Sequence, residues 1–335
     1  MAKIKYSAIV GSLGQNVDRF VAEGYKEESE IRFGFENEVD ALAGLGCLDA
    51  LDIYYAEEGI NSDADATNAV LDKYGLVISS TFTNLFGRRK WRNGSLASTD
   101  EKVRQAAIEL CKKNSDFNKK LKGIPPMTLW LGQDGFDYPF QTDYGKAWMN
   151  LIDSVRQICD YNPEVMVTLE AKPREPRNRT IVDTVANALL MCEKIDRKNV
   201  GVSIDIGHIW NVQQNVAQTV ALASEFGKLV TMHANDNYGV WDDDLIAGTI
   251  HHTEYLEMFY FLKKYEFNGN IAVDIFPYRE NTLGCTKETV LNLKKFEELV
   301  DTIGMDKLGA VIEEGDPVKC SAFIRENIYK IYRLP

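Results

Sequence analysis

Short hydrophobic runs rich in β-branched residues alternate along the chain with longer stretches in which apolar residues recur at helical spacing. Buried parallel strands have continuous apolar runs, whereas amphipathic helices have the wider spacing, so the alternation predicts repeated βα units. Eight runs fit strands that end in polar or small residues: Tyr6–Val10, Leu48–Tyr54, Leu76–Ser80, Met127–Leu131, Val165–Glu170, Val200–Asp205, Leu229–His233 and Ile271–Ile275. Eight such units predict an α/β fold, the (β/α)8 TIM barrel.

Local signals mark the ends of several predicted helices. Ser98-Thr99-Asp100-Glu101 is a capping box, and Thr180-Ile181-Val182-Asp183 resembles one. Gly75 and Gly227 follow helical segments, at positions that suit C-terminal caps. Since no linker rich in Gly, Pro or Ser divides the chain, we expect residues 1–302 to form one barrel domain.

Two segments are longer than closing a barrel requires. Between the third and fourth strands, a loop around residues 84–95 is expected to project from the barrel mouth, where it could cover a substrate. Residues 303–335 are predicted to form a C-terminal helical extension that packs on the barrel or on a neighbouring subunit. We therefore expect a homodimer or a homotetramer.

Composition and charge narrow the classes of partner. The chain has 335 residues, of which 45% are hydrophobic, enough to bury a substantial core. Its net charge of −12 repels phosphate backbones and anionic lipids, so we expect no nucleic-acid and no membrane partner. The basic run Arg88-Arg89-Lys90, with Arg92, is interpreted as a solvated loop.

The first residues of the sequence lack a signal-peptide pattern, and the six cysteines form no C-x-x-C pair. We therefore predict a cytoplasmic protein with reduced thiols.

Polar residues end the last four predicted strands: Glu170, Asp205, His233 and Asp274. The carboxyl ends of barrel strands meet at one mouth, and carboxylates there are costly to bury unless they are paired, protonated or bound to a metal. Each residue alone could be a helix cap, an ion-pair partner or a core histidine. Together, three carboxylates and an imidazole predict a divalent metal site, for which we expect Mn²⁺, with Mg²⁺, Co²⁺ or Zn²⁺ as alternatives.

A second group of candidate ligands lies beside the first. His208 is three residues beyond Asp205, and Asp242 and Asp244 follow the seventh strand. If Asp205 bridges two ions, these side chains could hold the second, so we expect one or two ions per subunit. The alternative is that the acidic triplet Asp242-Asp243-Asp244 is a solvated loop.

Three stretches are similar to the xylose isomerase-like superfamily, in particular to its xylose isomerase and L-rhamnose isomerase branch. Glu170-Ala171-Lys172-Pro173-Arg174-Glu175-Pro176-Arg177 is similar to the family's E-P-K-x-N-E-P-R stretch, and Asp242-Asp243-Asp244-Leu245 to its D-x-D-L. Residues 130–138 resemble its tryptophan-bearing stretch after the fourth strand. The resemblance spans about residues 5–280 and implies a metal-dependent aldose–ketose isomerase acting between C1 and C2 of a small carbohydrate.

The resemblance also implies roles for individual residues. One ion would be held by Glu170, Asp205, His233 and Asp274, and the catalytic ion by Asp205, His208, Asp242 and Asp244. The predicted catalytic residues are Glu170, Lys172, Asp205 and His208. The predicted substrate-binding residues are Trp130, Lys172, His208 and Arg279. His233 follows the rhamnose isomerase pattern, whereas the xylose isomerase pattern points to Asn235; we favour His233 because imidazole is the better ligand.

The chain departs from the family in the residues that would open the sugar ring. Xylose isomerase has a His–Asp pair after its second or third strand that helps to open the sugar ring, whereas residues 80–84 here contain no histidine. His251 and His252 could take that role or be ordinary surface residues.

A single-Mn²⁺ epimerase, lyase or dehydratase acting on a keto-sugar or an oxidised glycoside is the alternative function. A DNA-repair endonuclease is disfavoured by the acidic charge, and a non-catalytic sugar-binding protein is a further alternative.

Overall fold

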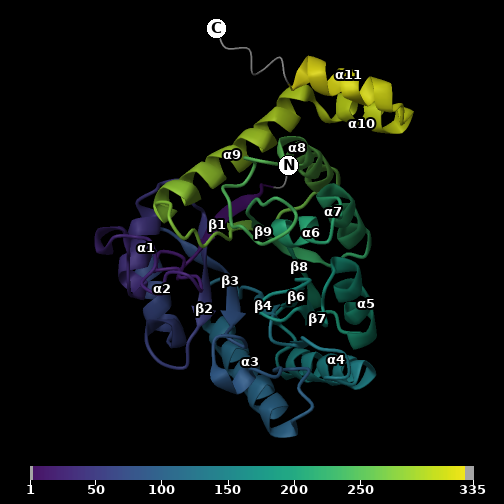
Figure 1. Cartoon of the computed structure of the whole chain (residues 1–335). Coiled ribbons are helices and arrows are strands. Elements are labelled where there is room, and N and C mark those ends of the chain that lie inside the picture. Colours follow the sequence, from purple (N-terminus) through teal and green to yellow (C-terminus); the bar gives the residue numbers. More distant parts are fainter. Residues whose placement is uncertain (1–2, 329–335) are drawn as a thin grey trace.

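The computed structural model describes residues 3–328, and the chain is built around eight parallel strands. These strands are β1 (Lys5–Ile9), β2 (Ala50–Tyr55), β3 (Val77–Thr83), β4 (Met127–Trp130), β6 (Val167–Glu170), β8 (Val200–Asp205), β9 (Leu229–Ala234) and β10 (Asn270–Val273). They close into a barrel in the order β1-β10-β9-β8-β6-β4-β3-β2 (Figure 1). The predicted (β/α)8 barrel is confirmed, with each strand within a few residues of its expected position.

Helices surround the barrel and extend beyond it. They are α1 (Phe35–Ala43), α2 (Ala64–Asp72), α3 (Glu101–Lys120), α4 (Tyr144–Tyr161), α5 (Val185–Ile195), α6 (Ile206–Trp210), α7 (Val216–Glu225), α8 (His252–Lys264), α9 (Thr282–Ile303), α10 (Met305–Glu314) and α11 (Pro317–Asn327). In Figure 1, α10 and α11 lie beyond the end of α9, outside the ring of helices. Additional C-terminal helices are therefore present, and residues 329–335 of the predicted extension lie outside the described part of the chain.

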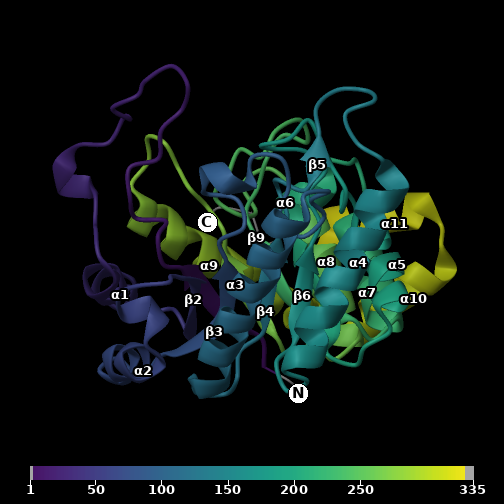
Figure 2. The ribbon, with the colours of Figure 1, turned by 90° about the horizontal axis from the view of Figure 1, so that it is seen from below.

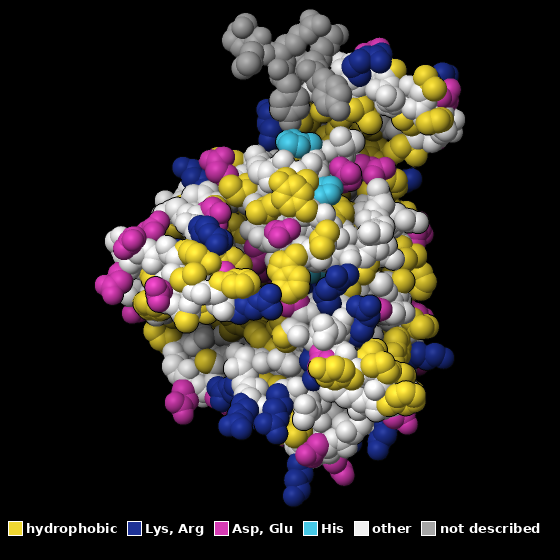
Figure 3. Space-filling view, viewed as in Figure 1, with side chains coloured by type: hydrophobic (Ala, Val, Ile, Leu, Met, Phe, Trp, Pro, Cys, Tyr) yellow, Lys and Arg dark blue, Asp and Glu magenta, His cyan; other side chains and the backbone are white. Residues whose placement is uncertain are grey.

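The loops that follow the strands gather at one end of the barrel, which is its mouth (Figure 2). Within residues 3–328, three short 3₁₀ helices lie between the larger elements: η1 (Glu28–Glu30), η2 (Ile60–Ser62) and η3 (Arg89–Trp91). An antiparallel pair, β5 (Gly135–Phe136) and β7 (Arg179–Thr180), joins the loops after β4 and β6. Figure 3 views the mouth face and shows hydrophobic side chains around it, with acidic and basic side chains between them.

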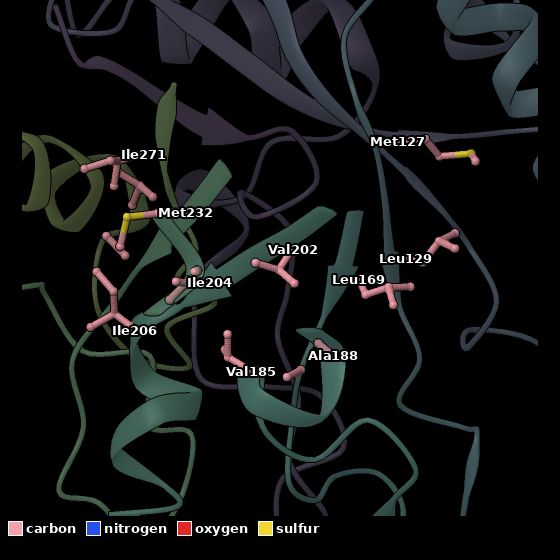
Figure 4. Packing of buried hydrophobic residues seen from close by; sticks show 14 of the residues in the cluster. Met127, Leu129, Leu169, Val185, Ala188, Val202, Ile204, Ile206, Met232 and Ile271 are labelled. Atoms are coloured by element: carbon pink, nitrogen blue, oxygen red, sulfur yellow. The ribbon is translucent and has the colours of Figure 1, made fainter. Parts of the chain in front are cut away.

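Period-two alternation along the strands separates a hydrophobic layer from the barrel interior. Leu169 of β6 and Val202 of β8 face outward, toward Val185 and Ala188 of α5 (Figure 4). The residues between them on each strand must face the barrel axis, because successive side chains on a strand point to opposite sides. This geometry places the last inward residue of each strand at the mouth.

Two helix starts differ from the predicted capping boxes. Asp100 is the N-cap of α3, and its carboxylate accepts from the backbone N–H of Lys102. Thr184, rather than Thr180, caps α5 through a hydrogen bond from the Asn187 backbone N–H. In both segments several short polar side chains compete for the cap, and the backbone path of the preceding loop decides between them.

Three further features of the described residues concern the cysteines, the helices and the basic run. All six cysteines are free thiols, four of them buried. Within residues 3–328, no helix combines the length and the apolar character needed to cross a membrane. Arg88, Arg89, Lys90 and Arg92 are exposed, as expected of a solvated loop.

The loop of residues 84–95 forms a fixed wall of the mouth. Trp91 is fully buried and its indole N–H donates to the carbonyl of Asn84 at 3.1 Å. At the far end of the loop, the buried carboxylate of Asp134 accepts from the backbone N–H groups of Ser95 and Ala97 at 2.7 and 2.9 Å. The projection predicted from the sequence is therefore closed by a bond within the loop and anchored at its far end by Asp134.

We expect Asp134→Ala to lower the free energy of unfolding by about 3 kcal/mol, because two buried backbone N–H groups lose their acceptor. Asp100→Ala is the control, since it removes a carboxylate that also accepts from backbone N–H groups but is exposed, and it should cost about 1 kcal/mol. Urea denaturation followed by circular dichroism measures both. Equal losses in the two variants would contradict the anchoring role of Asp134.

Candidate active site

Four neighbouring strands bring the first set of predicted ligands together at the mouth. Glu170 ends β6, Asp205 ends β8, His233 lies near the end of β9, and Asp274 directly follows β10. One nitrogen or oxygen atom from each side chain lies within 4.8 Å of the corresponding atoms of the other three. Asp205 and His233 are paired in register across β8 and β9, so the barrel itself sets their separation.

Buried atoms in this set lack hydrogen-bond partners. Within residues 3–328, neither Glu170 Oε2 nor His233 Nδ1 has one, although the two atoms lie only 3.3 Å apart. His233 Nδ1 is also 3.4 Å from Asp274 Oδ2. Leaving a buried polar atom unpaired costs roughly 1–3 kcal/mol. Three carboxylates and an imidazole that converge in this way fit a divalent cation such as Mn²⁺.

Proximity and burial shift the pKa values of these groups in the metal-free chain. Burial alone would lower the pKa of His233, but the carboxylates of Glu170, Asp274 and Asp205 outweigh it and raise this pKa to about 10. Burial raises the pKa of Asp274 to about 8, and burial also raises the pKa of Asp205. Without a cation the site therefore holds protons that a metal ion must displace.

A second set of candidate ligand atoms adjoins the first and shares Asp205. Atoms of Asp205, His208 and Asp242 lie within 4.8 Å of one another. Asp205 caps α6 by accepting a hydrogen bond from the His208 backbone N–H at 3.1 Å. This bond fixes the position of the His208 backbone relative to Asp205. The His208 ring has Nδ1 3.0 Å from the Ala171 carbonyl oxygen and Nε2 3.2 Å from Asp242 Oδ2. Asp242 is nearly buried, so the alternative of a solvated acidic loop does not describe it.

Lys172 lies between the second set and the ring of Trp130. Its ammonium group is 2.8 Å from both Asp242 Oδ2 and Glu175 Oε2, and 5.3 Å from the centre of the Trp130 ring. Burial alone would lower the lysine pKa, but the two carboxylates raise it above its ordinary value. Lys172 is therefore a cation at neutral pH, and its side chain lines the pocket at the barrel mouth.

Two predicted site residues, Asp244 and Arg279, lie apart from the two sets of ligand atoms. Asp244 stands outside both sets of converging atoms; its carboxylate accepts from the Phe276 backbone N–H at 3.2 Å and borders the pocket. The guanidinium of Arg279 lies over the ring of Tyr25 at 3.8 Å, and Arg279 is not among the described residues that line the pocket. The geometry thus gives no support to Arg279 as a substrate-binding residue.

The geometry also bears on the choice between His233 and Asn235 as a ligand. The side-chain amide of Asn235 donates to both carboxylate oxygens of Asp205, at 3.2 and 3.3 Å. Asn235 therefore orients a predicted ligand, while His233 brings a ring nitrogen directly into the set. This arrangement supports His233.

The two candidate ring-opening histidines have other surroundings. His251 Nδ1 is 2.7 Å from Asp236 Oδ1, and its ring stacks on Trp210 at 3.9 Å. The ring of His252 lies edge-on to Phe296 at 6.2 Å. Neither histidine borders the pocket as far as the chain is described, so the structure gives no support for their taking part in ring opening.

A pocket of about 290 Å³ opens above both sets. It is lined by Tyr54, Phe82, Phe86, Trp130, Glu170, Lys172, Glu175, His208, Asp242, Asp244, Asp274, Phe276 and Tyr278. Trp130, a predicted substrate-binding residue, borders the pocket edge-to-face with Phe86 at 4.4 Å. The other aromatic residues are not among the predicted site residues. Tyr54 and Phe82 could have been found, because aromatic residues stand near the ends of three successive strands, β2, β3 and β4. Phe86 comes from a loop and has no comparable signal.

Comparison with known proteins agrees with this architecture. A family model described as "Xylose isomerase-like TIM barrel" matches residues 39–314. That range includes the second to the eighth barrel strands and every candidate ligand in both sets.

Several solved structures share the fold. A D-tagatose 3-epimerase-like protein is 18% identical, with 89% of this chain and 99% of that chain covered and a TM-score of 0.65. A D-allulose 3-epimerase from Methylomonas sp., in complex with D-allulose, is 16% identical, with 88% and 97% covered and a TM-score of 0.65. An L-ribulose 3-epimerase is 13% identical, with 90% and 98% covered and a TM-score of 0.68. At these identities the likeness is one of fold.

We expect the metal-free protein to lose thermal stability as the pH rises. The pKa of His233 rises on folding from 6.5 to about 10 and that of Asp274 from 3.8 to about 8, so the folded chain keeps protons that the unfolded chain has lost. The resulting stabilisation is complete below the unfolded pKa values and disappears as the pH passes through the folded ones. Scanning fluorimetry from about pH 6 to about pH 8.5 measures the effect.

Manganese should oppose this loss. Because a cation binds more tightly as the protons leave, the difference between the melting temperatures with and without Mn²⁺ should widen as the pH rises. A constant difference across the pH range would contradict a metal site at these residues.

Proposed function

Because the chain belongs to the xylose isomerase-like TIM barrel family, we propose that it is a metal-dependent sugar isomerase that interconverts an aldose and a ketose. The observation that carries the proposal is the second set of ligand atoms, from Asp205, His208 and Asp242, beside the first. Hydrogen transfer between C1 and C2 requires two adjacent sugar oxygens to be held together. Two neighbouring cation sites that share Asp205 suit that task.

The chain supplies the cation sites and an oriented donor. When bound, divalent ions would act as Lewis acids on the sugar oxygens. Lys172 carries three N–H donors, of which Asp242 and Glu175 take two, leaving one for a sugar oxygen at C1 or C2. The ammonium group is held in place by these two ion pairs before substrate arrives, so little ordering remains to be done on binding.

Four aromatic residues of the pocket, Trp130, Phe86, Tyr54 and Phe82, exclude water from it. Trp130 and Phe86 meet edge-to-face on one side of the pocket, and Tyr54 and Phe82 meet at a ring distance of 5.2 Å near the β2 and β3 ends. Apolar rings of this kind pack against the hydrocarbon face of a sugar chain and keep solvent from its reacting carbons.

The charge of the pocket favours a neutral substrate. Five carboxylates line it, and Lys172 is its one lysine or arginine among the described residues. Two divalent ions together with Lys172 would only balance these carboxylates, leaving no positive charge for a phosphate or a second carboxylate. We therefore propose that the substrate is an unphosphorylated, uncharged monosaccharide.

A single-metal 3-epimerase is the second candidate. Asp244 lies outside the second set of ligand atoms, which weakens the case for a second ion. The three similar structures are named as epimerases or as epimerase-like. Epimerisation needs a base on one face of a carbon and an acid on the other, and Glu170 and Asp274, which approach His233 at 3.3 and 3.4 Å, could serve as that pair.

Incubation of the Mn²⁺-loaded protein with ketopentoses and ketohexoses in D₂O separates the two reactions. An isomerase should yield an aldose, with any deuterium confined to C1 or C2 by NMR. Deuterium at C3, with ketose as the only product, would overturn the isomerase proposal in favour of the epimerase.

Glu170→Gln should abolish Mn²⁺ binding at the first set and reduce turnover by at least about a hundredfold, because the ligand loses its charge at the centre of that set. Glu288→Gln, which removes an exposed carboxylate elsewhere, is the matched control and should behave as the unaltered protein. Isothermal titration calorimetry and the product assay report on both. Retained activity in Glu170→Gln would show that the ligand assignment is wrong.

For the substrate class, we expect the phosphate ester of the best neutral sugar to react with a kcat/KM at least about a hundredfold lower, because its dianion meets the pocket carboxylates. A paired assay of the free sugar and its ester measures this ratio. A preference for the ester would show that the proposed neutral class is wrong.

A further inference from the structure

One layer below the predicted ligands, the barrel interior is lined by hydroxyl groups. Ser80, Thr128, Thr168, Ser203 and Thr231 each stand two residues before a residue that reaches the mouth, and each is buried. Residues two apart on a strand face the same side, so these hydroxyls lie directly beneath the site. Barrel interiors are usually filled by bulky branched apolar side chains. A polar layer in this position therefore requires its own explanation.

Two of these hydroxyls form a chain that ends on a predicted ligand. Thr231 Oγ1 donates to Ser203 Oγ at 3.0 Å, and Ser203 Oγ lies 3.4 Å from His233 Nε2, at the long end for a hydrogen bond. On the opposite side of the same ring, Nδ1 faces Glu170 Oε2 and Asp274 Oδ2. The two ring nitrogens thus face different partners, a hydroxyl below and carboxylates above.

We propose that Ser203 and Thr231 are positioning residues that select the tautomer in which His233 binds the metal. With the proton on Nε2 and donated to Ser203 Oγ, the lone pair of Nδ1 points between Glu170 and Asp274, where a cation fits. Thr231 orients the Ser203 hydroxyl by donating to it, which leaves a Ser203 lone pair for the imidazole.

The neighbouring carboxylates explain why the His233 tautomer has to be selected. Glu170 Oε2, 3.3 Å from Nδ1, is a strong acceptor and draws the ring proton to the wrong nitrogen for metal binding. An acceptor on the Nε2 side opposes that pull. The ring is also held from the side by Phe82, whose centroid lies 5.4 Å away, so rotation of the imidazole is restricted.

This inference rests on the metal dependence of the proposed function and not on the reaction catalysed. The test is Mn²⁺ binding by isothermal titration calorimetry to the full-length Ser203→Ala and Thr231→Val variants. We expect the affinity of the first ion to fall roughly 10–100-fold in Ser203→Ala, as outer-layer partners of metal ligands typically contribute. Thr231→Val should lower it less, and the double variant should match Ser203→Ala, because Thr231 acts through Ser203.

The chain offers matched controls in the same layer. Ser80 and Thr128 bond each other at 2.7 Å, and this pair also bonds to the Pro126 carbonyl and to Thr168 rather than to a predicted ligand. Ser80→Ala and Thr128→Val should therefore leave Mn²⁺ affinity within about twofold of the unaltered protein. A fall in these controls as large as in Ser203→Ala would mean that the layer acts only through the general packing of the barrel, and would overturn the proposal.

A spectroscopic readout addresses the tautomer itself. The chain has four histidines, so ¹⁵N-histidine spectra of the Mg²⁺-loaded protein can be assigned with a His233→Gln variant. We expect His233 to carry its proton on Nε2 in the unaltered protein and to lose that slowly exchanging N–H signal in Ser203→Ala. A proton on Nδ1 in the unaltered protein would contradict the proposal.

The outcomes separate this inference from the metal site on which it rests. If the unaltered protein binds no Mn²⁺, the metal proposal fails. If Glu170→Gln abolishes binding of the first ion while Ser203→Ala leaves its affinity unchanged, the metal proposal stands and the positioning role is wrong. Should Ser203→Ala not fold cooperatively, Ser203→Cys, which keeps a weak acceptor, should show an intermediate affinity, and an unaltered affinity in both Ser203→Cys and Thr231→Val would overturn the proposal.

Discussion

The crowding of like charges at the ends of four adjacent strands is the constraint on which the site depends. Two unit charges about 4 Å apart interact by about 4 kcal/mol at an effective dielectric constant near 20, and three carboxylates here approach within 4.8 Å. The chain tolerates them only if protons or a cation neutralise them. The raised pKa values of Asp205, Asp274 and His233 are the response of the metal-free protein to that constraint. A divalent cation satisfies the same electrostatic requirement without protonating the ligands.

Much of this arrangement could be predicted from the sequence, because it depends on local periodicity and on barrel topology. Apolar runs locate the strands, the βα connections make them parallel, and parallel strands end together at the mouth. The neighbouring positions of β6, β8, β9 and β10 then bring Glu170, Asp205, His233 and Asp274 into one group. No long-range loop conformation is needed to bring these four residues together.

Features that depend on how loops meet were beyond the sequence. Arg279 lies over Tyr25 because the loop after β1 reaches the loop after β10, where Asn16 also donates to the Pro277 carbonyl at 3.3 Å. Nothing in either segment encodes that encounter. Asp244 is separated from Asp242 by the path of the loop after β9, in which Asp244 has a left-handed φ of 52°. Two acidic residues in one motif thus have different surroundings, and spacing alone could not distinguish them.

The hydroxyl layer shows that the strand alternation encodes more than a hydrophobic face. Three adjacent strands repeat one short pattern at their ends, in Thr168-Leu169-Glu170, Ser203-Ile204-Asp205 and Thr231-Met232-His233. The middle residue packs outward against helices, while the first and third face inward, one as a small hydroxyl and the other as a candidate ligand. A larger apolar residue at the first position would fill the same space but offer no partner to the ligand above it. The pattern therefore encodes two inward-facing layers, a lower layer of hydroxyl groups and an upper layer of candidate ligands. The lower layer limits the rotamers and tautomers that the ligands can adopt.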